Sequence, residues 1–234
     1  MVELWLPEGS TYQATEAQAK KFERFITQQQ GVESVTSYVG TGSPRFYLPL
    51  DQIFPQTNVS QIVVLPKDAK AREALRLKII QVFKTDFPEV RGRVKLLPNG
   101  PPVPYPVQFR VTGTEVEQVR LIADQVKEIM RRNPNARGVN DNWNESVKVL
   151  RIDLDQDKLR ALGINSQTVM RAANTILTGT TIGQFRDDEK LIDIVLRQPL
   201  EERATITALN NASIPAAGGR AVPLSQLATL RFVW

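Results

Sequence analysis

Two pairs of neighbouring carboxylates are the residues whose type and spacing could support acid–base chemistry. Asp153 and Asp155 would share one face of a strand, because strand side chains alternate, and Asp187 and Asp188 are adjacent. No other convergent group accompanies either pair, and the chain contains no histidine and no cysteine. These absences exclude thiol nucleophiles, disulfides, Cys/His zinc sites and histidine acid–base pairs. We therefore expect solvated carboxylates, no catalytic residue and no cofactor.

Nucleotide, metal and RNA sites also lack support in the sequence. Residues 40–42 read Gly-Thr-Gly, without the third glycine and the following helix of a dinucleotide fingerprint. Met1 is terminal, and Met130 and Met170 occupy helical apolar positions, so we interpret them as packing residues and not as soft-metal ligands. The predicted strand 90–97 has no aromatic residue on which RNA bases could stack. Lys and Arg, which give the net charge of +5, are interspersed with Asp and Glu, and we expect no nucleic-acid partner.

The stretch from 40 to 58 is the one part of the chain that follows no regular period. Its three prolines and two glycines interrupt helices and strands. It carries Phe46, Tyr47, Leu48, Ile53 and Phe54, which a solvent-exposed loop would not normally contain. A long irregular connection is usually functional or disordered, and this apolar content argues against disorder. Two interpretations remain: the aromatic side chains cap the end of a core, or they face a bound molecule.

Residues 1–143 repeat a strand–helix–strand pattern three times. Alternating apolar residues predict the strands, and apolar residues three and four apart predict the helix inside each unit. Ser10, with Gln13 three residues later, is the predicted N-cap of the first helix. The predicted strands, in pairs that flank each helix, are 2–6 and 32–39, 61–65 and 90–97, and 107–111 and 136–143.

Two such units in succession make βαββαβ, the ferredoxin-like order, in which one antiparallel sheet carries both helices on one face. Residues 1–98 contain one complete set. Residues 99–145, which begin in a proline-rich linker at 98–104, supply half of a second set. A half-sheet exposes an unpaired edge. We expect the missing half to lie outside this sequence or to come from another chain.

Residues 146–234 have a different pattern, which we interpret as an α+β subdomain inserted into the unfinished second set. A strand at 147–154 precedes a short helix that ends at Gly163, and Ser166 is the predicted N-cap of a longer helix. Gly179 and Gly183 flank a predicted turn region. Further extended segments are predicted at 191–196, 206–214, 220–222 and 228–234.

Six short motifs, in order, span nearly the whole chain. They are Leu6-Pro7-Glu8-Gly9-Ser10-Thr11 with Glu16, Gly31-Val32-Glu33-Ser34-Val35, Gly100-Pro101-Pro102-Val103, Ile152-Asp153 with Lys158 and Ala161-Leu162-Gly163-Ile164, Gly179 and Gly183 before the Asp193 strand, and Val222-Pro223-Leu224. Together they resemble the second large periplasmic loop of resistance–nodulation–division (RND) efflux transporters. The resemblance implies that 1–98 is the first porter subdomain of that loop, 99–145 a linker with half of the second, and 146–234 a docking subdomain truncated at its C-terminal end.

The resemblance also implies a role for the irregular stretch, which falls where RND drug pumps carry a glycine-containing switch loop. Gly40, Gly42 and Pro44 would belong to this loop, which is longer and richer in proline than the usual drug-pump loop. Apolar side chains on a loop can hold amphiphilic cargo without strict geometry. The implied cargo contacts are Phe46, Tyr47, Leu48 and Phe54 on the loop, and Arg137, Asn140, Asn142 and Trp143 across the cleft.

The function implied by the resemblance is export of hydrophobic or amphiphilic compounds by a proton-driven inner-membrane pump, with this segment on the periplasmic side. The metal-exporting branch uses methionines in the cleft, and the matching stretches here have none, which indicates organic cargo. The implied partners are two further copies in a homotrimer, a periplasmic adaptor and an outer-membrane channel. Two alternatives remain: a soluble ferredoxin-like interaction or regulatory module, and an RND-like lipid translocator.

Overall fold

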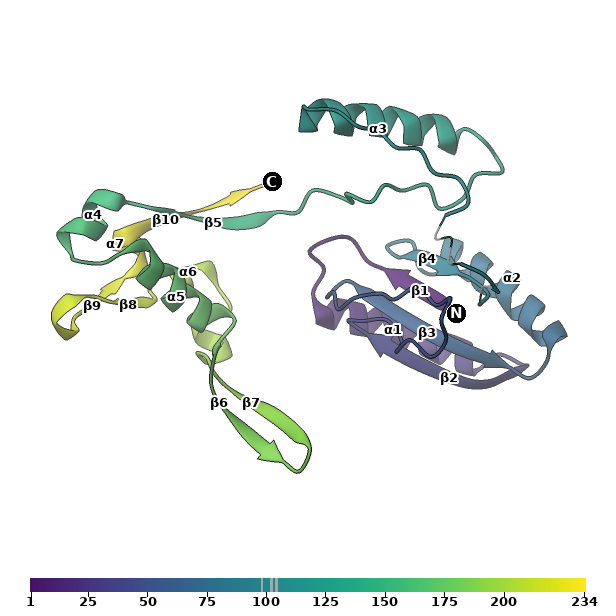
Figure 1. Cartoon of the computed structure of the whole chain (residues 1–234), viewed down its shortest axis with the longest axis horizontal. Helices are drawn as coiled ribbons and strands as arrows, with labels where there is room; N and C mark the ends of the chain where they lie inside the picture. Colours follow the sequence, from purple (N-terminus) through teal and green to yellow (C-terminus); the bar gives the residue numbers. More distant parts are fainter. Residues whose placement is uncertain (98, 102, 104) are drawn as a thin grey trace. The chain divides into compact units, whose positions relative to one another are not determined.

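The computed structural model describes residues 1–97, 99–101, 103 and 105–234. The chain forms two compact units, Met1–Val147 and Lys148–Trp234, which we describe separately (Figure 1). Both units mix helices with small antiparallel sheets, which confirms the predicted α+β class. No helix in the described part of the chain is both long enough and apolar enough to cross a bilayer.

The first unit contains the predicted ferredoxin-like fold. Its four strands are β1 (Val2–Trp5), β2 (Val32–Val39), β3 (Val59–Pro66) and β4 (Arg91–Val94). They form one sheet in the order β2-β3-β1-β4, and every neighbouring pair is antiparallel. Helices α1 (Tyr12–Thr27) and α2 (Ala69–Thr85) connect β1 to β2 and β3 to β4. This is the βαββαβ order expected from the repeat.

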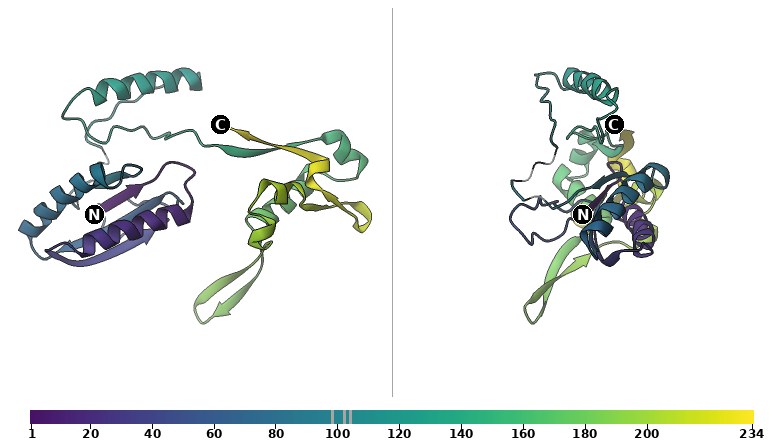
Figure 2. Two further views of the ribbon diagram at one scale, coloured as in Figure 1. Left: turned by 180° about the vertical axis from the view of Figure 1, so that it is seen from behind. Right: turned by 90° about the vertical axis from the view of Figure 1, so that its right-hand side faces the viewer.

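Strand alternation divides the sheet into a helix-covered face and an open face. Val2, Leu4 and Ile62 are buried in a core with Phe22 and Ile26 of α1, and both helices lie on this side (Figures 1 and 2). The neighbouring strand positions point the other way, because successive side chains alternate. The open face, as we define it, carries the row of paired residues Tyr38, Gln61, Glu3 and Arg93, one from each strand.

Two predicted helix caps are wrong by one residue. Thr11, not Ser10, is the N-cap of α1, and its side chain accepts a hydrogen bond from the N–H of Ala14 at 3.2 Å. The Ser10 hydroxyl instead donates to the Pro7 carbonyl. In the second unit Asn165, not Ser166, caps the longer helix. Adjacent residues of the capping type compete for the same role, so spacing alone does not separate them.

The third predicted strand–helix–strand unit forms only its helix, α3 (Val116–Arg131). The strands predicted at 107–111 and 136–143 are wrong, since both segments are irregular. A strand is stabilised by hydrogen bonds to a neighbour, and these two short segments pair with no strand among the described residues. The predicted linker 98–104 includes Pro98, Pro102 and Pro104, which lie outside the described residues.

The second unit is built around a two-stranded ribbon of β5 (Val149–Leu154) and β10 (Ala228–Val233). Between these strands the chain forms α4 (Gln156–Ala161), α5 (Ser166–Leu177), the hairpin β6 (Thr180–Asp187) and β7 (Lys190–Leu196), α6 (Ile206–Asn210), the pair β8 (Ser213–Pro215) and β9 (Ala221–Pro223), and α7 (Leu224–Leu227). Two short 3-10 turns, Leu200–Glu202 and Ala217–Gly219, complete it. Leu159, Val169, Ile176, Leu209, Ile214, Leu224 and Leu227 form its buried core.

Two further predictions for this unit are wrong. The region between Gly179 and Gly183 is not a turn, because β6 begins at Thr180 and accommodates Gly183 at an irregularity in its pairing with β7. The segment 206–214, predicted as extended, begins with the helix α6. Thr205 caps that helix by accepting a hydrogen bond from the N–H of Ala208 at 3.1 Å. A segment this short carries too few residues to show a helical period.

Candidate functional site

The irregular loop 40–58 contacts the open face of the sheet through Gln61, and its two ends lie beside the N-terminal end of α1, where the Thr15 hydroxyl donates to the Thr57 carbonyl at 2.7 Å. Its two legs are joined by backbone hydrogen bonds, from Gly42 to Ile53 at 3.1 Å and from Gln56 to Gly40 at 3.0 Å. The N–H of Ser43 donates to Oε1 of Gln61 at 2.7 Å in a buried contact. Leu50 is also buried. The loop is therefore fastened to the sheet at its base and along its inner side.

Both predicted glycines of this loop occupy positions where a side chain would not fit. Gly40 has φ +73°, a conformation that favours glycine, and a Cβ there would lie 2.9 Å from the Tyr12 ring. A Cβ on Gly42 would lie 2.8 Å from Cβ of Ile53 and 3.1 Å from the Ile53 carbonyl oxygen. The two legs approach each other closely because residue 42 has no side chain. Pro44, the third predicted residue, is exposed at the start of the tip.

The tip of the loop presents apolar side chains to solvent. Phe46, Leu48 and Phe54 are 56%, 78% and 69% exposed. Tyr47 is half-buried, and its ring stacks on Phe46 with 5.4 Å between ring centres. Burial, together with the nearby charge of Asp51, raises the pKa of the Tyr47 hydroxyl. Three of the four predicted loop residues are thus accessible to a bound molecule in this structure.

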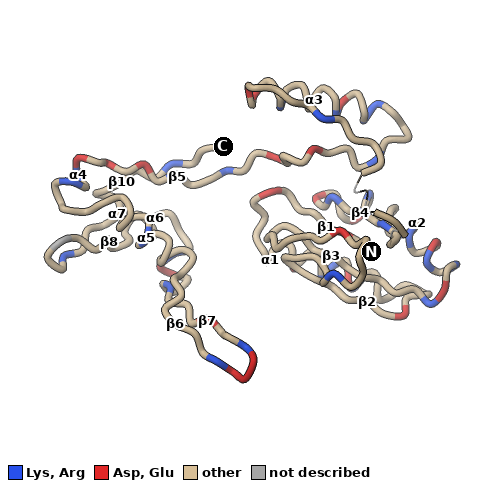
Figure 3. Tube along the Cα trace, in the orientation of Figure 1, with Lys and Arg blue, Asp and Glu red and all other residues tan. Residues whose placement is uncertain are grey.

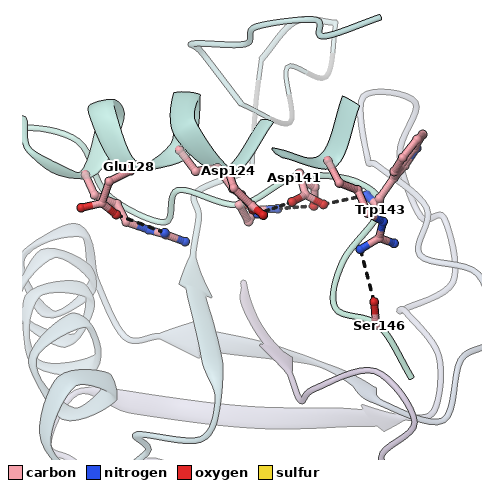
Figure 4. Close-up of polar contacts among 9 residues, drawn as sticks. Asp124, Glu128, Asp141, Trp143 and Ser146 are labelled. Carbon is pink, nitrogen blue, oxygen red and sulfur yellow. Dashed lines mark hydrogen bonds and ion pairs between the residues drawn. The ribbon is translucent and has the colours of Figure 1, made fainter. Parts of the chain in front are cut away.

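The predicted residues after α3 lie on a segment that returns along the helix. Lys127 of α3 binds Asp124 at 2.7 Å and Asp141 of the return segment at 2.5 Å (Figure 4). Burial alone would raise the pKa of Asp141, but the hydrogen bond and charge of Lys127, with the N–H of Trp143, hold this pKa below its usual value. Hydrogen bonds to Asp124 and Asp141 raise the pKa of Lys127. This ion pair positions the return segment.

Trp143 is held by a second contact with α3. The guanidinium of Arg120 lies 5.5 Å from the Trp143 ring centre and donates to the Ser146 hydroxyl at 3.4 Å (Figure 4). Trp143 keeps 48% of its surface exposed. Asn140 is half-buried and donates to the Asp141 carbonyl at 3.3 Å.

Arg137 and Asn142 are exposed. Over the described part of the chain, no ring contact or ion pair joins Phe46, Leu48 or Phe54 to the return segment. The predicted site residues therefore form two separate clusters in the first unit, one at the loop 40–58 and one on the return segment after α3.

The open face also contains charged residues that the sequence analysis did not single out. Glu3 is almost completely buried and contacts Lys95, while Arg93 lies 3.7 Å from its other carboxylate oxygen. Arg91 lies over the Trp5 ring at 5.4 Å. The alternation of β4 and of β1 would have placed these side chains on one face, but it gives no sign that Glu3 is buried there.

Asp153 and Asp155 have structural roles. Asp153 binds Arg151 at 2.7 Å and also contacts Arg231 of the neighbouring strand. Asp155 caps α4, accepting hydrogen bonds from two backbone N–H groups. Asp187 and Asp188 form the tip of the β6–β7 hairpin. The described residues contain no group of three or more His, Cys, Asp or Glu side chains that could hold a metal ion.

Comparison with known proteins identifies the family. The profile that describes the AcrB/AcrD/AcrF family matches residues 1–233. The chain belongs to the AcrB/AcrD/AcrF family. This membership confirms the resemblance to RND transporters that the six motifs indicated.

Individual relatives of this family member are distant. The nickel and cobalt resistance protein CnrA of Cupriavidus metallidurans is 24% identical, over 90% of this chain and 20% of CnrA. Two crystal forms of a heavy metal efflux pump have the same fold, with TM-scores of 0.76 and 0.74 at 20% and 19% identity. Each match covers 99% of this chain and 25% of the pump. The chain thus spans about a fifth to a quarter of the length of these relatives.

Proposed function

We propose that this chain is the periplasmic cargo-capturing part of a proton-driven RND efflux transporter of the inner membrane. Membership of the AcrB/AcrD/AcrF family and the likeness in fold to an efflux pump support a transport role over a soluble regulatory module. In the complete protein we expect a homotrimer that works with a periplasmic adaptor and an outer-membrane channel. The residues 1–98, 99–145 and 146–234 would supply one porter subdomain, half of a second and a docking subdomain.

The cargo that we propose is a hydrophobic or amphiphilic organic compound. The observation that carries this proposal is the exposed apolar tip of the loop, with Phe46, Leu48 and Phe54 all more than half exposed on a base that is fastened to the sheet. Covering exposed aromatic side chains with a ligand makes the free energy of binding more favourable. Clustered exposed apolar residues also commonly mark binding sites. Trp143, with Arg137, Asn140 and Asn142, would supply the second wall.

Metal ions are the second candidate cargo, because the named relatives are a nickel and cobalt resistance protein and a heavy metal efflux pump. Metal capture in this chain would need oxygen ligands, since the sequence has no histidine or cysteine and only three methionines. The exposed side chains of Phe46, Leu48 and Phe54 offer no such ligand. An RND-like lipid translocator would use the same apolar surface for a different hydrophobic cargo.

The test uses cells that depend on the full-length protein for tolerance to toxic compounds. We expect Phe46→Ala with Phe54→Ala to lower tolerance to several amphiphilic drugs by at least about fourfold, with nickel and cobalt tolerance unchanged. Leu77→Ala is the matched control, since Leu77 is 61% exposed on α2, which covers the other face of the sheet. Unchanged tolerance to every drug at normal expression would exclude a cargo role for the loop, and a selective loss of metal tolerance would favour the second candidate.

A further inference from the structure

Strand β4 and the residue that follows it carry a row of cations on the open face of the sheet. Arg91 pairs with Trp5 and Arg93 with Glu3 across β1, and Lys95 continues the same alternation. Successive members of this row are two residues apart, or about 7 Å along the strand. Figure 3 shows that elsewhere in this unit positive and negative residues are mixed. We call Arg91, Arg93 and Lys95 the basic row.

Among the described residues, the carboxylate of Glu3 forms ion pairs with this row. Glu3 contacts Lys95 and lies 3.7 Å from Arg93, and it is buried beneath them. The side chains of Arg93 and Lys95 are only 28% and 17% exposed. Arg91 is half-buried over Trp5 and makes no ion pair with any carboxylate among the described residues. Three partly desolvated cations with one anion leave a net charge of about +2, which a bound anion would offset.

Aromatic rings hold two of the cations in place. The guanidinium of Arg91 lies 5.4 Å from the Trp5 ring centre, and that of Arg93 lies 4.5 Å from the Tyr105 ring centre. Stacking on a ring restricts a guanidinium while its edge N–H groups stay able to donate. Guanidinium groups donate paired hydrogen bonds to carboxylates, sulfonates and phosphates, whose oxygens match this geometry.

The basic row lies beside the attachment of the loop. Arg93, Glu3 and Gln61 are consecutive partners across β4, β1 and β3, and Gln61 is the residue that holds Ser43. Arg93 and Gln61 are two strand spacings apart, so the distance between their backbones across the sheet is about 10 Å. A molecule with an anionic head on the basic row could therefore extend an apolar body toward the loop.

We propose that the basic row is the head-group subsite for anionic amphiphiles, with Arg91 as its principal contact. This proposal rests on the proposed function, and it narrows the cargo to organic compounds that carry a carboxylate, sulfonate or similar anion. Lys and Arg on an edge strand also protect a sheet from pairing with other chains, and that role alone would require no anion binding. The two roles can be distinguished by comparing the binding of two probes that share a ring system, of which only one carries a negative charge.

The probes are anilinonaphthalene sulfonate, which is anionic, and phenylnaphthylamine, which has the same ring system without the sulfonate. Fluorescence titration uses the full-length protein in nanodiscs, with the signal of empty nanodiscs subtracted. We expect Arg91→Gln to weaken sulfonate binding by about tenfold and to change phenylnaphthylamine binding by less than about twofold. Arg91→Lys should lose less sulfonate affinity than Arg91→Gln, because lysine keeps the charge but not the paired hydrogen bonds, and the wild-type affinity should fall with added salt.

Arg24→Gln is the matched control, because Arg24 is an exposed arginine of α1, on the helix-covered side, and we expect it to bind both probes normally. Equal sulfonate affinity in the wild type and Arg91→Gln would overturn the proposal, and so would an equal loss of both probes in a folded variant. If Phe46→Ala weakens the binding of phenylnaphthylamine, that result would support the proposed function, whatever the sulfonate probe shows. Failure of the basic row and failure of the proposed function are thus distinguishable.

Discussion

The backbone N–H of Ser43 donates a 2.7 Å hydrogen bond to the side-chain Oε1 of Gln61, and both residues are buried. Gln61 belongs to β3, in the middle of the sheet, whereas Ser43 belongs to the loop that carries the exposed aromatic tip. One side chain of the sheet therefore fixes the inner leg of the loop. This hydrogen bond therefore fixes the position of the loop from which the apolar tip extends.

Replacing Gln61 with leucine should release this leg. Leucine fills a similar volume but accepts no hydrogen bond, so the Ser43 N–H would be buried without a partner. An unsatisfied buried donor costs about 1–3 kcal/mol of unfolding free energy. Chemical denaturation of the purified chain would measure this loss, and hydrogen exchange would show faster exchange at Ser43.

Gln52→Leu is the control for this experiment, because Gln52 is exposed on the same loop and holds no backbone group in the described structure. We expect its stability to stay within about 0.5 kcal/mol of the wild type. If Gln61→Leu left the exchange rate of the Ser43 amide unchanged, the loop would not depend on this hydrogen bond.

Gly42→Ala should force the two legs of the loop apart. The added Cβ would lie 2.8 Å from Cβ of Ile53 and 3.1 Å from the Ile53 carbonyl, which accepts the hydrogen bond from residue 42 itself. Overpacking of this kind costs about 1–3 kcal/mol. Thermal unfolding should show the loss for Gly42→Ala and none for Gly100→Ala, since no atom lies within 4 Å of a Cβ on Gly100. Equal melting temperatures for the two variants would contradict the close approach of the legs.

The sequence predicted most of the first unit because its strands and helices have strong periods. β2 covers 32–39, the predicted range, and the elements from β1 to β4 follow one another in the predicted order. The strands at 107–111 and 136–143 were wrong for a physical reason: an alternating pattern describes a side chain's environment, but a strand also needs a neighbour to accept its hydrogen bonds. Nothing in the local sequence reports whether that neighbour is present.

The candidate site was predictable only in part. Prolines and glycines located the loop, and its aromatic residues suggested contact with cargo. Its attachment through Gln61 and the burial of Glu3 were not predictable, because alternation places both residues on the open face without showing what covers them. The ion pair between Lys127 and Asp141 spans 14 positions, and only tertiary structure brings these residues together.

This ion pair should make the attachment of the return segment depend on pH. The pKa of Asp141 is lowered in the folded chain, so its contribution to stability is present above the unfolded-state pKa, near 4, and is lost as pH falls through the lower folded value. The pKa of Lys127 is raised, so its contribution is present below about pH 10.5 and is lost as pH rises through the higher folded value. The stabilisation should therefore be complete between about pH 5 and pH 9.

Asp141→Asn tests this dependence, because asparagine keeps the shape of the side chain and removes its charge. At pH 7 we expect the variant to be less stable by about 1–3 kcal/mol, since Asp141 accepts hydrogen bonds from Lys127 and from the N–H of Trp143 at 2.9 Å. The difference from the wild type should shrink as pH falls from about 4 through the lower folded pKa of Asp141, below which the wild-type carboxylate is protonated as well. Asp124→Asn is the matched control: Asp124 binds the same lysine but is 70% exposed, so its loss should cost less than about 0.5 kcal/mol at any pH. A difference between Asp141→Asn and wild type that stayed constant from pH 7 to pH 3 would show that shape, and not charge, positions the segment that carries Trp143.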